Sequence, residues 1–371
     1  MKATVAQGDL SKTLTLVASV VPATSSIPIL SNMLIEAEKG KLRISSTDLD
    51  ISVISEIQAD VSEEGSIIIP AKRLSEIVRE LSGDEVYLEG DEKQLKVICA
   101  RAAFRMMGMD KEQFPKIVDL ESEKKITVDG RALERMIRST IYAVAKDETR
   151  PVLSGVLWEL GKEEMSMVGT DAHRLARMSI KVSCGVEPSL GLIVPPKALN
   201  HVVRLIEDAT EVSIAFDRGF IGFFVGNTIV YSRRIEGTFP NYKQVIPTEN
   251  KNILKTNRLD LLTAVRRVSL LSDSKTRKIK MHLSKKGLKV STSTPDLGEA
   301  EEEVPADYVG EEMVVGYNAN YILDILKTTD TTDIRIEIGT PVGPTVLRPT
   351  PEPEGESYLC LVMPLRLSES E

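Results

Sequence analysis

The residues with the greatest potential for chemistry lie in one short run, Thr170-Asp171-Ala172-His173-Arg174, with Ser154 shortly before it. A serine, a histidine and an acid are the residue types of a hydrolase triad, and Asp171 and His173 would share one side of an extended segment. No second acid, oxyanion motif or G-x-S-x-G nucleophile elbow accompanies them. We therefore predict no catalytic residues and a chain that is not an enzyme, in which His173 and Arg174 orient a loop, bind a partner, or do both.

Cysteine and histidine are too few and too scattered for a metal site or a disulfide framework. The chain holds three of each: Cys99, Cys184, Cys360, His173, His201 and His282. An odd number of distant cysteines is typical of reduced thiols in a cytosolic protein. Neither a G-x-x-x-x-G-K-[ST] loop nor a G-x-G-x-x-G fingerprint occurs, so we expect no nucleotide cofactor and no metal.

The composition is that of an ordinary folded protein. Of 371 residues, 42% are hydrophobic and 27% are charged, and the length favours two or three domains. Polar residues interrupt the first apolar stretch, 10–21, and no run of about 18 apolar residues exists, so we expect neither a signal peptide nor a membrane span. The net charge of −8 argues against a nucleic-acid partner only if the charges are evenly spread.

An amphipathic helix pattern recurs three times, at intervals of about 125 residues. The apolar positions of the three helices are Leu74, Ile77, Val78 and Leu81; Leu199, Val202, Val203 and Ile206; and Ile322, Ile325 and Leu326. A short apolar strand precedes each helix, at 67–69, 192–194 and 313–315. Pro70 and Pro195 mark the strand-to-helix turn in the first two copies, and Gly316 takes the comparable place in the third. The agreement in order and spacing indicates an internal repeat.

Three further elements repeat with these helices. A period-two strand leads into a Thr-Asp pair in each copy: Thr47-Asp48, Thr170-Asp171 and Thr294-Pro295-Asp296. Phe114-Pro115 recurs as Phe239-Pro240. Each copy also opens with its own amphipathic helix, whose apolar faces are Leu10, Leu14, Val17 and Val21; Leu133, Met136, Ile137 and Ile141; and Leu261, Val265 and Val268.

Each copy therefore consists of a helix, strands, a second helix and further strands. We predict an α+β fold of three tandem domains, each with two helices packed on antiparallel sheets. Polar stretches near residues 122 and 249 set the boundaries, which gives domains of residues 1–122, 123–249 and 250–371. Three similar domains in a row can propagate into an arc, and two arcs paired head to tail can close into a ring.

Basic residues gather on the solvent faces of the predicted helices and just after one of them. The set is Lys12, Lys72, Arg73, Arg79, Arg131, Arg135, Arg138, Lys197, His201, Arg204, Arg258, Arg266, Arg267, Lys275, Arg277, Lys278, Lys280 and Lys327. Such a surface suits contact with phosphates without recognition of bases. Exposed helices also carry Lys and Arg for solvation alone, and Glu76, Glu80, Glu134 and Glu207 dilute this face, so the charge pattern leaves both interpretations open.

Three motifs add a family resemblance to this pattern. They are Thr170-Asp171-Ala172-His173-Arg174-Leu175-Ala176, Phe239-Pro240-Asn241-Tyr242 and Met363-Pro364-Leu365-Arg366-Leu367. With the tandem domains, they make the chain resemble the bacterial DNA polymerase III beta subunit, the DNA sliding clamp, from residue 1 to residue 367. The resemblance implies a homodimeric ring with helices lining the hole. Such a ring encircles duplex DNA and tethers the replicative polymerase as a processivity factor, with no chemistry of its own.

The resemblance also implies an apolar cleft between the second and third domains that binds a short linear motif of partner proteins. The matching positions are Leu153, Thr170, His173, Arg174, Leu175, Pro240, Val245, Asn318, Tyr321, Val362, Met363, Pro364, Leu365 and Arg366. Aliphatic and methionine side chains form an adaptable pocket, and Arg174 and Arg366 would hold the peptide's backbone or carboxyl groups. Ordinary core burial is the alternative for the apolar members.

The resemblance further implies sites for DNA and for the second chain. The basic residues expected to contact DNA are Lys72, Arg73, Arg79, Arg138, Lys197, Arg204, Arg266 and Lys275, of which Arg73 and Lys197 match the family best. Phe104, Leu270 and Leu271 sit at the positions of the ring interface. The expected partners are double-stranded DNA, the polymerase III alpha subunit, the clamp loader, and other polymerases and repair proteins with a clamp-binding motif. The expected location is the cytoplasm, at the nucleoid.

Three features depart from the family pattern. Ala172 stands where the family has glycine, and Ser25-Ser26 follow the first helix where a basic residue is common. Residues 368–371 extend the chain with an acidic Ser-Glu-Ser-Glu tail, which we expect to modulate peptide access to the cleft. A different class of protein also stays open: a three-domain scaffold that never encircles DNA would share the repeat, the cleft and the acidic charge. Retention of a closed dimer on circular DNA distinguishes the two.

Overall fold

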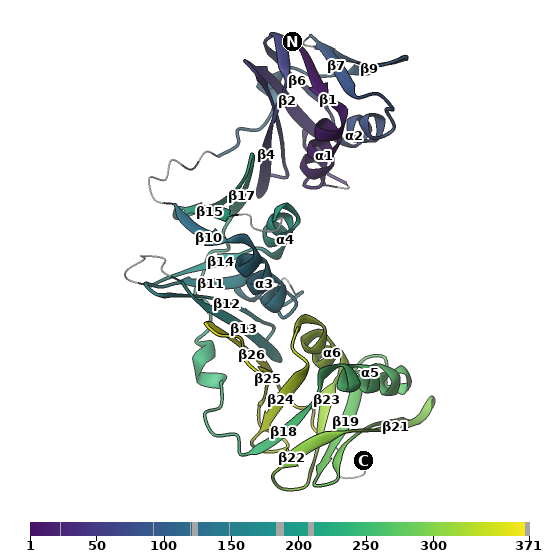
Figure 1. Cartoon of the computed structure of the whole chain (residues 1–371), viewed down its shortest axis with the longest axis vertical. Helices are drawn as coiled ribbons and strands as arrows, with labels where there is room; N and C mark the ends of the chain where they lie inside the picture. Colours follow the sequence, from purple (N-terminus) through teal and green to yellow (C-terminus); the bar gives the residue numbers. More distant parts are fainter. Residues whose placement is uncertain are drawn as a thin grey trace. The chain divides into compact units, whose positions relative to one another are not determined.

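The computed structural model describes residues 1–22, 24–91, 93–118, 120, 125–147, 149–182, 189–206 and 211–367 (Figure 1). The predicted boundary at 122, Cys184, Glu207 and the tail 368–371 lie outside these ranges. The chain divides into two compact units. Unit 1 is Met1–Arg131 with Lys197–Arg234, and unit 2 is Ala132–Pro196 with Ile235–Glu371.

Helices form at all six places where the amphipathic pattern predicts them. They are α1 (Gln7–Ala18), α2 (Ala71–Arg79), α3 (Gly130–Ile141), α4 (Pro196–Leu205), α5 (Arg258–Val268) and α6 (Ala319–Thr328). Short 3-10 turns η1 (Pro28–Ser31), η2 (Lys111–Gln113), η3 (Pro151–Leu153), η4 (Tyr242–Val245) and η5 (Ser269–Leu271) lie in the connections. Most residues of the expected apolar faces are buried, and Ile77, Leu81, Ile141, Val203 and Ile206 are partly buried. Leu10, Leu14 and Val17 of α1 are excluded from solvent, which is the main source of helix stability in a folded domain.

Two antiparallel sheets make up the strand layers of unit 1. The five-stranded sheet runs in the order β5 (Asp60–Glu63), β1 (Lys2–Ala6), β7 (Glu85–Gly90), β8 (Gln94–Cys99) and β9 (Ala102–Met107). The eight-stranded sheet runs β10 (Ile126–Asp129), β15 (Glu211–Phe216), β16 (Phe220–Val225), β17 (Thr228–Arg233), β4 (Ile51–Gln58), β3 (Lys41–Thr47), β2 (Asn32–Glu38) and β6 (Gly65–Pro70). Helices α1 and α2 pack against each other in this unit (Figure 1).

Unit 2 repeats this plan with two more antiparallel sheets. The nine-stranded sheet runs β14 (Leu190–Val194), β11 (Val156–Leu160), β12 (Glu164–Thr170), β13 (Arg174–Lys181), β26 (Glu356–Val362), β25 (Thr345–Thr350), β24 (Asp333–Ile338), β18 (Asn252–Asn257) and β22 (Ala306–Val309). The four-stranded sheet runs β21 (Gly298–Val304), β20 (Gly287–Thr294), β19 (Lys278–Ser284) and β23 (Met313–Asn318). Helices α5 and α6 pack against each other in this unit (Figure 1).

The two largest sheets are each shared by two copies of the sequence repeat. In unit 1, β17 of the second copy pairs with β4 of the first, and in unit 2, β26 of the third copy pairs with β13 of the second. The predicted boundaries follow the repeat, whereas the compact units follow the shared sheets. This pairing matters for the site, because it places side chains from two copies on one continuous surface.

One detail of the predicted repeat is wrong. Gly316 does not mark the strand-to-helix turn of the third copy but lies within β23, paired with Lys280. The turn falls at Asn318, whose side chain accepts a hydrogen bond from the N–H of Asn320 at 2.9 Å and so caps α6. Asparagine provides by capping what proline provides in the other two copies by its fixed φ.

The described residues contain neither a membrane-spanning helix nor a metal-binding cluster. None of the described helices is long and apolar enough to cross a membrane. Among the same residues, no group of three or more His, Cys, Asp or Glu side chains is arranged to hold a metal ion. Cys99 and Cys360 are both buried free thiols.

Candidate functional site

A tight turn from Thr170 to Arg174 joins β12 to β13 in unit 2. The Thr170 hydroxyl donates to the carbonyl oxygen of Arg174 at 2.7 Å and accepts from the N–H of Ala172 at 3.2 Å. One Asp171 carboxylate oxygen accepts from the N–H groups of His173 and Arg174, each at 2.9 Å. Short polar side chains that bond their own backbone fix turns in this way, so the Thr-Asp pair determines where His173 and Arg174 stand.

The Arg174 guanidinium lies inside this surface, with its side chain only 7% exposed. Its Nε donates to Asp171 at 3.1 Å, Nη1 to Asp324 at 2.7 Å and Nη2 to the carbonyl oxygen of Tyr142 at 2.6 Å. It also lies over the rings of Tyr142 and Tyr321, 5.4 and 4.5 Å from their centroids. These partners within the chain favour the interpretation that Arg174 orients the turn.

The last described residues connect the turn to β23. The N–H of Met363 donates to the carbonyl oxygen of His173, and the N–H of Leu365 donates to that of Gly316, both at 2.8 Å. A Cβ atom at Gly316 would come within 2.8 Å of Leu367 Cδ2 and 3.0 Å of the Leu365 carbonyl oxygen. Glycine leaves room there for the close approach of Leu365 and Leu367, and the Met-Pro-Leu-Arg-Leu motif is held beside the turn.

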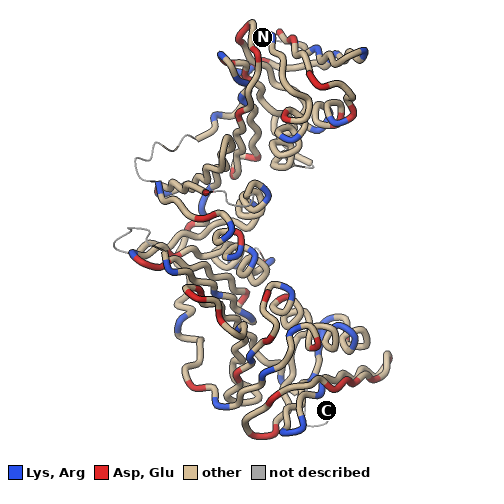
Figure 2. The backbone as a smooth tube through the Cα atoms, in the orientation of Figure 1, with Lys and Arg blue, Asp and Glu red and all other residues tan. Residues whose placement is uncertain are grey.

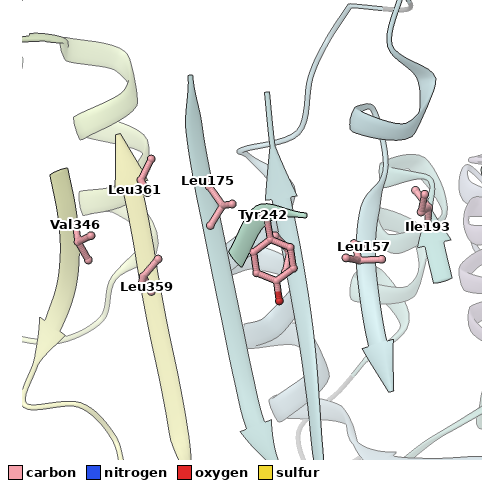
Figure 3. Close-up of a cluster of buried hydrophobic side chains, with 8 residues drawn as sticks. Leu157, Leu175, Ile193, Tyr242, Val346, Leu359 and Leu361 are labelled. Atoms are coloured by element: carbon pink, nitrogen blue, oxygen red, sulfur yellow. The ribbon is translucent and has the colours of Figure 1, made fainter. Parts of the chain in front are cut away.

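An apolar cluster lies beneath the turn and its neighbouring strands (Figure 3). Its buried members are Leu157, Val168, Leu175, Ile193, Tyr242, Val346, Leu359 and Leu361. Leu175 comes from β13, and Leu359 and Leu361 come from the paired strand β26. Val346, Leu359 and Leu361 were not predicted to belong to this cluster. The alternation of a strand reveals its buried face but not which strand lies beside it.

The predicted cleft residues all lie in unit 2, and the structure separates them by exposure. His173, Pro240, Val245, Met363 and Arg366 are exposed; Asn318, Tyr321, Pro364 and Leu365 are partly buried; and Leu153, Thr170, Arg174, Leu175 and Val362 are buried. Val245 is 51% exposed, so its apolar side chain is accessible to a partner. The buried members support the exposed ones from below.

A hollow of about 360 Å³ opens beside these residues, between the 237–243 loop and the strands β11 and β14. Its lining includes Glu159, whose carboxylate accepts from the Tyr242 hydroxyl at 2.6 Å and from Ser166 at 2.8 Å. Burial and the bond to Glu159 raise the pKa of Tyr242 to about 12, so this hydroxyl stays a donor. Of the Phe-Pro-Asn-Tyr motif, only Pro240 was predicted to belong to the site. No sequence motif points to Glu159.

The three side chains that resembled a catalytic triad do not form one. The Ser154 hydroxyl donates to the carbonyl oxygen of Pro151 at 2.7 Å. The Asp171 carboxylate is bound by Arg174 and by backbone N–H groups of the turn. Within the described part of the chain, no hydrogen bond links the side chains of Ser154, Asp171 and His173, so the geometry does not activate a nucleophile.

The residues predicted to contact DNA have exposed side chains in the structure. Figure 2 shows Lys and Arg along the helices that carry most of them. Those in unit 1 are Lys72, Arg73, Arg79, Lys197 and Arg204, and those in unit 2 are Arg138, Arg266 and Lys275. Four of the eight pair with acids: Arg73 with Glu76, Arg79 with Glu80, Arg138 with Glu134 and Lys197 with Asp48. The other four have no ion pair with any described residue.

His201 is not on the solvent face, where the sequence analysis placed it. It is 4% exposed, and its Nδ1 lies 3.1 Å from the Ser19 hydroxyl. Burial, helped by the charges of Arg204 and Lys197, lowers the pKa of His201 to about 4. The imidazole is therefore neutral near pH 7 and contributes no positive charge to the basic face.

Arg258 is also not free on the solvent face. Its Nε donates to the carbonyl oxygen of Thr331 at 2.9 Å, and its Nη1 donates to that of Leu326 at 2.8 Å. Leu326 lies in the last turn of α6, where carbonyl groups lack partners within the helix. Arg258 therefore caps a neighbouring helix, a role that helical periodicity could not reveal.

Of the residues predicted for the ring interface, one lies on an edge strand and two lie in a 3-10 turn. Phe104 is exposed on β9, the last strand of the five-stranded sheet. Leu270 is 75% exposed in η5, and Leu271 beside it is partly buried. The strand β21 is likewise the edge of the four-stranded sheet, and Figure 2 shows it as a run of acidic residues. Edge strands carry unpaired backbone groups that can pair with another chain.

Comparison with protein families covers nearly the whole chain in three consecutive segments. Residues 1–118 match the model of the DNA polymerase III beta subunit, N-terminal domain. Residues 127–241 match the central domain of the same subunit, and residues 243–366 match its C-terminal domain. The order of the three matches is the order of the internal repeat.

Individual relatives agree with the family models. The beta sliding clamp of Caulobacter vibrioides is 34% identical over 375 residues, which cover 99% of this chain and 100% of the relative. Crystal structures of the sliding clamps of Pseudomonas aeruginosa and Bartonella birtlesii, each bound to griselimycin, are both 30% identical to the chain. Each superposes with a TM-score of 0.94 over 99% of this chain and 100% of the other.

Proposed function

This chain belongs to the family of DNA polymerase III beta subunits, the beta sliding clamps, and from that premise we propose that two copies close into a ring around duplex DNA. A beta sliding clamp is a processivity subunit that catalyses no reaction itself, and its partners are DNA and a DNA polymerase. The ring tethers the polymerase and so raises its effective concentration at the primer end.

The observation that carries the proposal is the extent of the family match. All three domains of the beta subunit occur once each, in order, and relatives align over their full length. A scaffold that had kept only a peptide-binding surface would have no need of the first domain, which is matched over residues 1–118.

The proposed ring closes through the two open sheet edges. The edge at β9 carries Phe104 and Arg105 and is flanked by Arg101, all exposed. The edge at β21 carries the exposed carboxylates of Glu301 and Glu303. Pairing β9 of one chain with β21 of the other would satisfy the backbone groups of both edges and bring opposite charges together. Phe104, Leu270 and Leu271 would then be buried in the interface.

The proposed DNA surface consists of the eight exposed basic residues on and beside the helices. Half of them are already paired with acids of the same chain, which weakens each contact with phosphate. Weak contacts suit a ring that must slide, because retention comes from closure around the DNA and not from affinity. The proposed contacts are with phosphates and not with bases.

The proposed partner surface is the exposed set around the Thr170 to Arg174 turn. His173, Val245, Met363 and Arg366 form its accessible part, over the apolar cluster of Figure 3. We propose that it binds short motifs of the polymerase III alpha subunit, the clamp loader, and other polymerases and repair proteins. Griselimycin, bound in the structures of two relatives, is proposed to bind this surface too.

We also propose the domain limits and the location of the protein. Domains of 1–122, 123–249 and 250–371 follow the repeat, and the three family segments support a division into three. A protein that acts on the bacterial chromosome works in the cytoplasm at the nucleoid, and two buried free thiols suit a reducing compartment.

Retention on nicked circular DNA tests the ring directly. The protein is loaded by a clamp loader, the salt is raised to about 0.3 M to weaken ordinary phosphate contacts, and bound protein is measured before and after the circle is cut. We expect retention on the circle and release on cutting. Equal release from circular and linear DNA would contradict the ring and favour a scaffold that does not encircle DNA.

A further inference from the structure

We infer that Arg174 is a positioning residue, locked by Asp324 and Tyr142, that sets the shape of the partner surface without binding the partner. The inference rests on the proposed function of that surface. It reassigns a residue that the motif match had placed among the peptide ligands, and it adds two residues, Asp324 and Tyr142, to which neither the sequence analysis nor the family match gives a role.

The guanidinium of Arg174 touches three separate elements. It bonds to Asp171 in the turn, to Asp324 on α6 and to the Tyr142 carbonyl just after α3. The turn carries the exposed His173, and α6 carries Tyr321, whose ring lies 4.5 Å from the guanidinium carbon. The planar fork of N–H donors holds its partners in fixed directions, whereas the three donors of an ammonium group rotate on a flexible stem.

A buried hydroxyl network holds Tyr142 in place. Its hydroxyl lies 3.0 Å from that of Tyr358 and 3.2 Å from the sulfur of Cys360. The Tyr358 hydroxyl also lies 3.1 Å from that of Thr328 on α6 and donates to the carbonyl oxygen of Ser139 on α3 at 3.1 Å. Burial raises the pKa of both tyrosines well above the usual value, so both stay protonated. The Tyr142 carbonyl that accepts from Arg174 is therefore held in place through the bonds of its own side chain.

Unit 1 contains the same turn in the first copy of the repeat. The Thr47 hydroxyl donates to the carbonyl oxygen of Ile51 at 3.0 Å and accepts from the N–H of Leu49 at 3.0 Å. The Asp48 carboxylate accepts from the N–H groups of Asp50 and Ile51 at 3.1 and 2.7 Å. These bonds correspond one for one to those of Thr170 and Asp171, and the turn forms without an arginine.

The residues that hold Arg174 in unit 2 have different counterparts in unit 1. The turns at Thr47 and Thr170 and the helices α1 and α3 are offset by 123 residues, so Arg174 and Tyr142 correspond to Ile51 and Ser19. The helices α4 and α6 of the second and third copies have the same offset, so Asp324 corresponds to His201. There a neutral imidazole beside a hydroxyl takes the place of the guanidinium and the carboxylate. In unit 1 the turn is joined to α4 by the ion pair between Asp48 and Lys197. The fold therefore does not need the buried guanidinium cluster, which points to a role for that cluster in the partner surface of unit 2.

Griselimycin affinity, measured by isothermal titration calorimetry on the full-length protein, tests the assignment. Asp324→Asn removes the charge that holds Nη1, and we expect griselimycin to bind about tenfold more weakly. Asp324→Glu, which keeps the carboxylate, restores most of the affinity. Asp330→Asn removes an exposed charge just after α6 and leaves the affinity unchanged. If Asp324 had only a structural role, griselimycin affinity would not depend on whether residue 324 carries a carboxylate.

A double-mutant cycle separates positioning from direct binding. Arg174→Lys keeps the positive charge but loses the fork, and we expect the same loss as for Asp324→Asn. Because the two groups act as one unit, the double variant loses little more than either single variant. Full affinity of Arg174→Lys, or additive losses in the double variant, would overturn the inference in favour of a direct electrostatic contact with the ligand.

The surface variants Met363→Ala and His173→Ala distinguish this inference from the proposed function. Both side chains are exposed beside the turn, and we expect each change to weaken griselimycin binding. Unchanged affinity in both variants would mean that this surface is not the binding site, and the proposed function of the surface would fail. Weakened affinity in these two with unchanged affinity in Asp324→Asn would refute the positioning role alone.

Discussion

Ala172 occupies a backbone position that favours glycine, with a φ of 74°. Leu49, at the corresponding place in the first copy, has a φ of 80°. In both turns the side-chain bonds of the Thr-Asp pair impose this conformation, whichever residue follows. A side chain in the left-handed region costs about 1–2 kcal/mol, so the turn stores local strain in this chain where the family pattern has glycine.

Ala172→Gly should raise the free energy of unfolding by about 0.5 kcal/mol. Relief of the left-handed strain outweighs the larger entropy that glycine gives to the unfolded chain, which costs about 0.4–1 kcal/mol. Urea unfolding followed by circular dichroism measures the change. Ala18→Gly, in the helical conformation of α1, serves as the control and should lower stability by up to about 1 kcal/mol. A loss of stability in Ala172→Gly would show that the turn is not strained.

His201 makes the free energy of unfolding depend on pH. In the unfolded chain its pKa returns to 6.5, and in the folded chain it is about 4. Stability is therefore complete above pH 6.5 and falls as the pH drops towards 4, because only the unfolded chain takes up the proton. From pH 7 to pH 5 the loss from this residue is about 2 kcal/mol.

His201→Asn should remove that part of the pH dependence. Urea unfolding at pH 7 and pH 5 gives the loss for each variant, and the wild-type loss should exceed that of His201→Asn by about 2 kcal/mol. His173→Asn, which changes an exposed histidine, is the matched control and should retain the wild-type loss. Equal losses in wild type and His201→Asn would contradict the buried, neutral state of this imidazole.

Among the elements, η5 and the edge strands β9 and β21 carry groups that the folded chain leaves unsatisfied. Leu270 contributes little to the fold of its own unit, because it is 75% exposed. The two edges also differ in charge, with Arg105 on β9 and the exposed Glu301 and Glu303 on β21. Features that do not stabilise one chain become understandable if a second chain covers them.

Leu270→Asp should weaken the proposed dimer at least about tenfold, since a charge would be buried at the interface. Light scattering after size-exclusion chromatography measures the mass across a dilution series. The melting temperature of the single chain should change little, because the side chain is exposed there. Val309→Asp on β22, which is 72% exposed at another sheet edge, should leave the dimer intact. A dimer unaffected by Leu270→Asp would place the interface elsewhere.

At the scale of the whole molecule, a net charge of −8 is compatible with the proposed DNA surface because acidic and basic residues are segregated. Acidic residues line β21, and basic residues lie on the helices and beside α5 (Figure 2). In the proposed function, the excess of acid would oppose tight adhesion to DNA, and the basic residues on the helices would supply the sliding contact. Affinity and retention are then separate quantities, and substitutions can change one without the other.

The variant K72A/R204A/R266A/K275A should lower the salt dependence of DNA binding without abolishing retention on closed circles. Each lost phosphate contact reduces the slope of log affinity against log salt by about 0.9. Equilibrium binding to linear duplex measures the slope, and the loading assay measures retention. K285A/K286A, at the tip of the β19–β20 hairpin, removes exposed charge away from the helices and should leave the slope unchanged. Loss of retention on circles in the quadruple variant would mean that affinity, not closure, holds the protein.

The sequence by itself determined the local elements. The apolar faces of α1 to α6, the strands before them and the Thr-Asp turn were all predictable, because each depends on residues only a few positions apart. The repeat then gave three copies of one α+β plan, and the motifs gave the family. The exposed members of the proposed partner surface, such as His173 and Met363, were predicted through the motifs alone.

The tertiary structure decided which residues of this set are accessible and what holds them. Arg174 and Asp324 are 150 residues apart in the chain, and no local pattern links them. His201 and Arg258 fit a basic helix face by periodicity, yet they are a buried neutral imidazole and a cap on another helix. Periodicity shows which face of a helix or strand is apolar. The segment that packs against that face is set by sheet pairing and helix contacts, which depend on distant segments meeting in the folded chain.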